Sequence, residues 1–79
     1  MQIRVRYFAV LREMKAVDEE IVEVVDGMTI ESLYNHLFSP APPAGRIPVM
    51  FARNQSYVTP DTRLCAGDEV AFIPPLGGG

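Results

Sequence analysis

The segment FIPPLGGG at the end of the sequence contains one group that could take part in chemistry. From residue 73 to residue 79 no side chain carries a functional group, so the reactive group we expect is the terminal carboxylate of Gly79. Pro74 and Pro75 favour an extended backbone that stands away from the domain. Six residues from Pro74 onward reach about 20 Å, and glycines can pass through a narrow channel. The segment therefore predicts a carboxylate held out on a slim arm for another protein's active site.

Other candidates for chemistry are few, and each has a simpler structural interpretation. His36 falls on the polar side of a predicted helix, and we expect it to be solvated. Cys65 has no basic neighbour in sequence that would lower its pKa, so we expect a small, half-buried structural residue. Two pairs of adjacent carboxylates occur, at 19–20 and at 68–69. Within each pair the two side chains point to opposite faces of a strand, so we interpret both pairs as solvated charge. No cysteine–histidine cluster has metal-ligand spacing, so we expect no metal site.

Composition narrows the class of protein. The chain has 79 residues, 48% of them hydrophobic, and a net charge of −3, which indicates one small globular domain. There is no basic stripe, which argues against a nucleic-acid partner. The apolar runs are too short to span a membrane. Cys65, the one cysteine, has no partner for an internal disulfide, so we expect a cytoplasmic protein.

The first part of the chain predicts two strands. Over residues 2–8, apolar Ile3, Val5 and Tyr7 alternate with polar side chains, which indicates a strand with one buried face. Phe8 breaks the alternation and falls on the polar face. We expect a short helical turn over 11–15, a second strand over 20–25 that forms a hairpin with the first, and a turn at 26–27.

The middle of the chain carries the strongest periodic signal. Thr29 is a good N-cap, and an apolar stripe at helical spacing follows it, made of Ile30, Leu33, Tyr34, Leu37 and Phe38. Ser39-Pro40 ends this helix, and a proline-rich loop extends to Arg46. Further strands are expected over 48–54, 57–58 and 69–73, with a turn at 67–68 and the last strand pairing with the first. The predicted fold is α+β, a mixed sheet with the main helix on one face.

Three segments together resemble one family. GDEVAFIPPLGGG (67–79), YFAVLRE (7–13) and FARNQSYV (51–58) are similar to the small subunits of molybdopterin synthase, which are ubiquitin-like sulfur carriers. The resemblance covers the whole chain in length and element order, and the terminal motif is its most specific part. It implies a β-grasp (ubiquitin-like) domain over 1–73, followed by a flexible tail over 74–79.

The resemblance also implies a function in molybdenum cofactor biosynthesis. An E1-like adenylating enzyme would use ATP to activate the carboxylate of Gly79, and a sulfur-donor protein would convert it to a thiocarboxylate. The tail would then enter the large synthase subunit and give sulfur to a cyclic pterin phosphate. Gly78 would keep the tail thin. The chain would bind no cofactor, would not be catalytic alone, and would form a heterotetramer with the large subunit.

The family docks through positions that this chain also has. They imply a partner surface made of Phe8, Arg12, Tyr57 and Ile73, continued by Pro74, Pro75, Leu76 and Gly77. Exposed apolar side chains at the base of the tail fit a docking patch. For Phe8 the alternative is a covered edge residue without a role in docking.

Three other functions remain open on sequence grounds. A sulfur carrier of thiamine thiazole synthesis shares the fold and the Gly-Gly end, but it is usually shorter and lacks Pro-Pro. A ubiquitin-like protein modifier would be joined through Gly79 to lysine amines on its targets. A plain interaction module would carry an idle tail.

Overall fold

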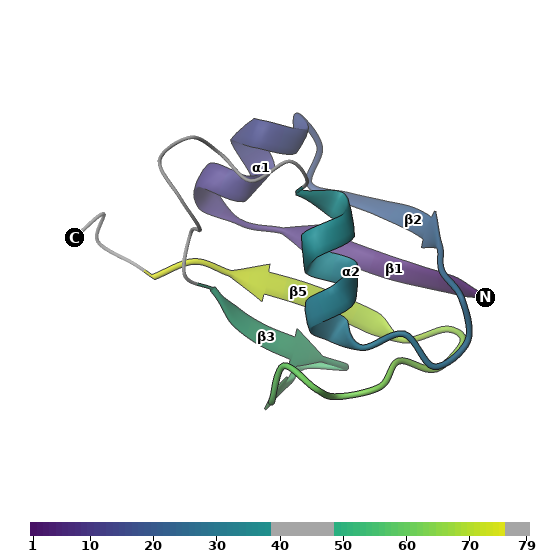
Figure 1. Cartoon of the computed structure of the whole chain (residues 1–79). Coiled ribbons are helices and arrows are strands. Elements are labelled where there is room, and N and C mark those ends of the chain that lie inside the picture. The colour runs from purple at the N-terminus through teal and green to yellow at the C-terminus, as the bar shows by residue number, and fades with distance from the viewer. Residues whose placement is uncertain (39–48, 76–79) are drawn as a thin grey trace.

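The computed structural model describes residues 1–38 and 49–75 of the chain. This part forms one mixed sheet of five strands, together with two helices (Figure 1). In chain order they are β1 (Gln2–Tyr7), α1 (Ala9–Lys15), β2 (Glu19–Glu23), α2 (Ile30–Leu37), β3 (Met50–Arg53), β4 (Ser56–Val58) and β5 (Glu69–Ile73). Among these residues no helix is long and apolar enough to cross a membrane.

The sheet brings the two ends of the domain to its centre. Its strand order is β2-β1-β5-β3-β4, and β1 and β5 run parallel while every other pair is antiparallel. The register places Val5 opposite Val70 and Tyr7 opposite Phe72. The predicted pairing of the first and last strands is confirmed. Because β1 and β5 are parallel, Phe8 and the segment that follows Ile73 leave the sheet at the same end.

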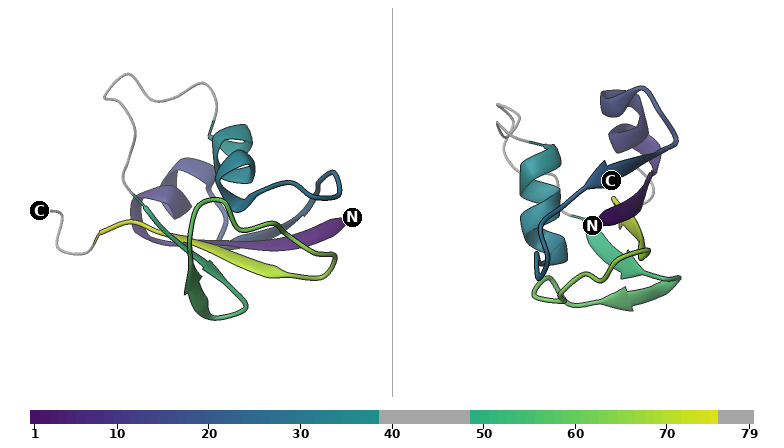
Figure 2. Two further views of the ribbon diagram at one scale, coloured as in Figure 1. Left: turned by 60° about the horizontal axis from the view of Figure 1, so that its bottom comes forward. Right: turned by 90° about the vertical axis from the view of Figure 1, so that its right-hand side faces the viewer.

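Helix α2 packs across one face of the sheet (Figure 2), which we call the covered face. The helix begins as predicted, because the Thr29 Oγ1 accepts a hydrogen bond from the Ser32 N–H at 3.1 Å. Alternation along β1 and β5 sends one set of side chains beneath it. The largest fully buried side chains are Tyr7, Phe72, Ile3, Leu11, Ile30, Leu33, Val5 and Val70.

Element boundaries differ slightly from the sequence prediction. The expected helical turn is a helix, α1, that begins at Ala9 and joins the two strands of the first hairpin. Strand β2 begins and ends earlier than expected, and strand β3 is shorter. The predicted loop from Ser39 to Arg46 lies outside the described residues. The prediction identified the elements correctly because hydrophobic periodicity marks the middle of an element better than its ends.

The prediction that both acidic pairs are solvated was wrong for Asp68 and holds only in part for Glu20 and Glu69, which are half-buried. Asp68 is 8% exposed, and it accepts hydrogen bonds from the Asn54 Nδ2 at 3.1 Å and from the Cys65 N–H at 2.8 Å. The Glu20 carboxylate is half-buried and accepts a hydrogen bond from the Tyr7 hydroxyl. Glu20 thus gives the buried Tyr7 a hydrogen-bond acceptor, and Asp68 is itself buried with its carboxylate hydrogen-bonded.

The prediction for Cys65 was also wrong. Its side chain is exposed, because the preceding residue, Leu64, turns into the core at 3% exposure and the chain then enters a turn. His36 is exposed on α2, as predicted. At the other end of β5, Pro74 is buried and Pro75 is exposed. The backbone therefore stays against the domain one residue longer than expected.

Candidate functional site

The second face of the sheet, which we call the open face, lies opposite α2 (Figure 2). It carries the strand residues of the other parity. The register pairs Ala52 of β3 with Ala71 of β5, and Ala52 also with Tyr57 of β4. On the other side of β5, Ala71 is paired with Arg6 of β1. The centre of this face is therefore occupied by two of the smallest side chains.

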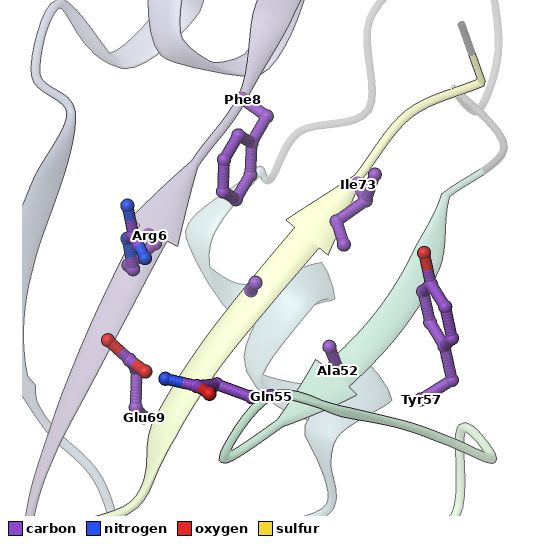
Figure 3. Close-up of a pocket in the computed structure, with 8 residues that line it drawn as sticks. Arg6, Phe8, Ala52, Gln55, Tyr57, Glu69 and Ile73 are labelled. Carbon is purple, nitrogen blue, oxygen red and sulfur yellow. The ribbon is translucent and has the colours of Figure 1, made fainter.

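A hollow of about 240 Å³ lies over these alanines, and we call it the sheet pocket (Figure 3). Eight residues from β1, β3, β4, β5 and the adjoining turns line it: Arg6, Phe8, Ala52, Gln55, Tyr57, Glu69, Ala71 and Ile73. Ala52 and Ala71 form its floor, because their side chains end at Cβ. A pocket with an apolar floor and a few polar groups on its rim is a common form of binding site.

The apolar wall of the sheet pocket faces the end from which the tail leaves. Phe8 and Ile73 stand at the end of β1 and β5, and Tyr57 stands across the floor from them (Figure 3). Tyr57 is 65% exposed and Phe8 is 36% exposed, while Ile73 is half-buried. Three of the four residues expected to dock a partner thus lie around one pocket. The structure locates them together, while their role in binding stays a prediction.

The polar groups gather at the opposite end. Figure 3 shows Glu69 and Gln55 beside each other there, with Arg6 along the β1 side. The Arg6 guanidinium carbon lies 5.4 Å from the centre of the Phe8 ring, a cation–π contact that steadies both side chains. One cation and one carboxylate therefore share the rim, and the pocket has no net charge.

The turn between β3 and β4 is held against the start of β5. The Asn54 N–H donates to the Glu69 carbonyl at 2.7 Å, and the Glu69 N–H donates to the Asn54 Oδ1 at 2.9 Å. Both turn residues have positive φ, 50° for Asn54 and 72° for Gln55, as a tight two-residue hairpin turn requires. Asparagine tolerates this conformation better than most residues. This network fixes where Gln55 and Tyr57 stand at the pocket.

Arg12 does not join the pocket. It lies on α1, and its Nε is 3.6 Å from the Asp18 Oδ1 in an exposed ion pair. Exposed pairs of this kind contribute little to stability. The predicted docking set therefore divides into three residues around the sheet pocket and one on the neighbouring helix.

The predicted reactive group lies beyond the described residues. The structure includes the base of the tail, through Pro74 and Pro75, whereas Leu76, Gly77, Gly78 and Gly79 lie outside the described part. Within residues 1–38 and 49–75, no group of three or more His, Cys, Asp or Glu side chains could hold a metal ion. The expectation that the chain binds no cofactor stays a prediction.

Sequence reasoning missed five of the eight residues around the pocket. These are Arg6, Ala52, Gln55, Glu69 and Ala71. One signal was present, because Ala71 has the same parity as Ile73 on β5 and must share its face. The pairing of Ala52 with Ala71 depends on a strand register that hydrophobic patterning alone does not specify.

Residues 5–79 match the ThiS family. The chain belongs to this family. Two curated relatives support the assignment over all or nearly all of their length. The "Molybdopterin synthase sulfur carrier subunit" of Chlamydomonas reinhardtii is 43% identical, with 100% of both chains covered. The protein of the same name from Escherichia coli is 37% identical, with 98% of this chain and 99% of the relative covered.

Solved structures show the same fold. Small archaeal modifier protein 1 of Haloferax volcanii superposes with a TM-score of 0.80 at 24% identity, covering 95% of this chain and 98% of the other. A chain of the protein–protein complex of subunits 1 and 2 of molybdopterin-converting factor from Helicobacter pylori superposes with a TM-score of 0.68 at 22% identity, with both chains covered completely. The predicted β-grasp class is confirmed.

Proposed function

We propose that this ThiS-family chain is the sulfur-carrying small subunit of a molybdopterin synthase and acts in molybdenum cofactor biosynthesis. The observation that carries the proposal is the 43% identity, over the full length of both chains, to a relative of that name. The family match extends to residue 79 and so includes the Gly-Gly terminus. The alternatives of a thiamine-thiazole carrier and a protein modifier are not favoured by these relatives.

The chemistry is assigned to the carboxylate of Gly79. A carboxylate is a poor electrophile, so an E1-like enzyme would first join it to AMP from ATP, with release of pyrophosphate. Sulfide-level sulfur supplied by a donor protein would then attack the acyl carbon, release AMP and leave a thiocarboxylate. Gly78 and Gly77 have no Cβ, which suits passage into a narrow active site. The chain itself would carry and deliver the sulfur atom, and the catalytic groups would belong to its partners.

Delivery requires docking on the large subunit, with the tail directed into its active site. The sheet pocket suits this role because Ile73, which lines it, is the last residue of β5 and directly precedes the tail. Pro75, which is exposed, would guide the tail away from the sheet, and Leu76 would lie between it and the glycines. Tethering the thiocarboxylate in this way raises its effective concentration at the acceptor.

A solved structure of similar fold supports a large-subunit partner, because the Helicobacter pylori structure is a complex of subunits 1 and 2 of molybdopterin-converting factor. We propose the same kind of partner here, in a heterotetramer located in the cytoplasm. Arg12 would contribute from α1 at the margin of this interface. The activating enzyme would use the same face, since it must reach the same carboxylate.

Intact-mass measurement tests the proposed chemistry. The chain is incubated with ATP, a cognate activating enzyme and a sulfur-donor protein. We expect a mass gain equal to the replacement of one oxygen by sulfur, and no gain in a variant that lacks residues 78–79.

An unchanged mass, with the enzymes active on another carrier, would contradict the proposal. Conjugates of the chain with lysine amines of other proteins would instead identify a protein modifier. Unimpaired function without residues 78–79 would identify an interaction module with an idle tail.

A further inference from the structure

The floor of the sheet pocket is unusual for the middle of a sheet. Central strand positions favour β-branched and aromatic side chains, which pack well on a pleated surface. Here Ala52 and Ala71 stand directly opposite each other on β3 and β5. On the covered face the residues next to Ala71 along β5 are Val70 and Phe72, both fully buried. The small residues are thus confined to the open face.

The side chains that surround this floor give the sheet pocket the form of a socket for a single side chain. Phe8, Ile73 and Tyr57 rise around the two alanines (Figure 3). Ala52 is 7% exposed although it belongs to the open face, so the surrounding side chains already shield this part of the floor from water, while Ala71 is half-buried. In protein interfaces, the largest binding energies come from single side chains that fill well-packed pockets of this kind.

The charges on the rim limit what can fill the socket. Arg6 and Glu69 both line it, so an incoming charged side chain would meet a like charge as well as an opposite one. Interface centres are also depleted of charged residues. The occupant that suits an apolar floor, three apolar or aromatic walls and a rim without net charge is an uncharged, mainly apolar side chain.

From these observations we infer that the sheet pocket accepts one uncharged, mainly apolar side chain of the large subunit, and that Ala71 limits the size of that side chain. The inference rests on the proposed function, which supplies the partner. Continuity with the tail supports the same partner. Ile73 is both a wall of the socket and the last strand residue before the tail. A side chain seated on the two alanines would therefore fix the point from which the tail enters the partner's active site.

The substitution Ala71→Val tests the inference because it fills the socket without harming the strand. Ala71 is half-buried and faces Ala52 and Arg6 across the open face, where two added methyl groups have room. Valine also has a higher strand propensity than alanine. We expect thermal unfolding at or above the wild-type temperature and at least tenfold weaker binding to the cognate large subunit in isothermal titration calorimetry.

The matched control is Gln2→Val. Gln2 is exposed on β1, has the same parity as Arg6, and lies outside the sheet pocket. This change adds the same side chain to the same face, and we expect binding within twofold of wild type. If Ala71→Val also binds within twofold of wild type, the inference that the sheet pocket accepts a side chain of the large subunit is disproved. It is also disproved if Gln2→Val loses as much affinity as Ala71→Val.

The variant Glu69→Gln distinguishes the kind of occupant. An uncharged side chain predicts a change of less than about threefold, since the rim carboxylate makes no ion pair with it. A loss of tenfold or more would show a basic occupant and overturn the inference. Sedimentation of the chain alone provides a further check, because self-association that Ala71→Val abolishes would show a second copy in the socket instead.

Failure of the inference and failure of the proposed function are separable. If the wild-type chain acquires sulfur and binds the large subunit, but Ala71→Val binds equally well, only the socket is wrong. If the wild-type chain neither acquires sulfur nor binds the large subunit, the proposed function is wrong. The inference then fails with it, because the large subunit no longer supplies the side chain that would fill the sheet pocket.

Discussion

The covered face and the open face use the same strands, yet they differ in what occupies the centre. Under α2, Val5, Val70 and Phe72 are fully buried. Above the open face, Ala52 and Ala71 leave a hollow with larger side chains around it. A small domain must fill one face to fold at all. Its other face is released from that demand, and here it carries the hollow that the proposed partner would fill.

Phe72→Ala should have the largest effect and would confirm which face holds the fold. Phe72 is fully buried, and the centre of its ring lies 5.0 Å from the centre of the Tyr34 ring and 5.8 Å from the centre of the Phe51 ring. Truncation should cost about 3–5 kcal/mol of unfolding free energy, measured by urea denaturation.

The matched control for the covered face is Tyr57→Ala, which removes a 65% exposed aromatic ring from the open face. We expect it to change stability by less than about 0.5 kcal/mol. Similar losses for the two variants would mean that both faces stabilise the fold and would remove the distinction between them.

Tyr7→Phe should have a smaller and pH-dependent effect. Burial and the hydrogen bond to Glu20 raise the pKa of the Tyr7 hydroxyl above its ordinary value of 10.0. Because the folded pKa is the higher one, this contribution is complete below pH 10 and is lost as the pH rises above that value. Removing the hydroxyl should cost about 1 kcal/mol at pH 7.

Denaturation at pH values from 7 to 11.5 checks this prediction. The difference in stability between wild type and Tyr7→Phe should be constant below about pH 9.5 and should shrink above pH 10. A difference in stability that stays constant across the whole range would show that folding does not raise the pKa of the Tyr7 hydroxyl.

Phe8→Ala should have a small effect on stability and a clear effect on binding. The change removes a part-exposed ring and its contact with Arg6, which together should contribute less than about 1 kcal/mol to stability. We expect about tenfold weaker binding to the large subunit by calorimetry, since a wall of the sheet pocket is lost.

Val10→Ala is the control, because Val10 is 40% exposed on α1 and lies outside the sheet pocket. It should bind like wild type. Unchanged affinity for Phe8→Ala would instead favour the alternative that Phe8 is an edge residue with no part in docking.

The covered face was predictable from the sequence, because its signals are local. Alternation along 2–8 and 69–73, and an apolar stripe after Thr29, identified the main elements and the sheet with its helix. Each signal depends only on the period of its own element. The pairing of the first and last strands was also predicted, whereas its parallel direction comes from the structure alone.

The open face was only partly predictable, because it depends on register and on turns. Phe8, Tyr57 and Ile73 were identified through the family resemblance, and the structure brings them to one pocket. The alanine floor arises from a cross-strand pairing that no local pattern encodes. Likewise, the burial of Asp68 depends on Asn54, which is distant in sequence.

Donation of sulfur tests the central claim most directly. The thiocarboxylated chain is mixed with the cognate large subunit and a cyclic pterin phosphate, and its intact mass is followed during a single turnover. The proposed function predicts that the chain returns to the carboxylate mass only when both the large subunit and the pterin are present. A thiocarboxylate that persists with both present, while an established carrier is consumed under the same conditions, would contradict it.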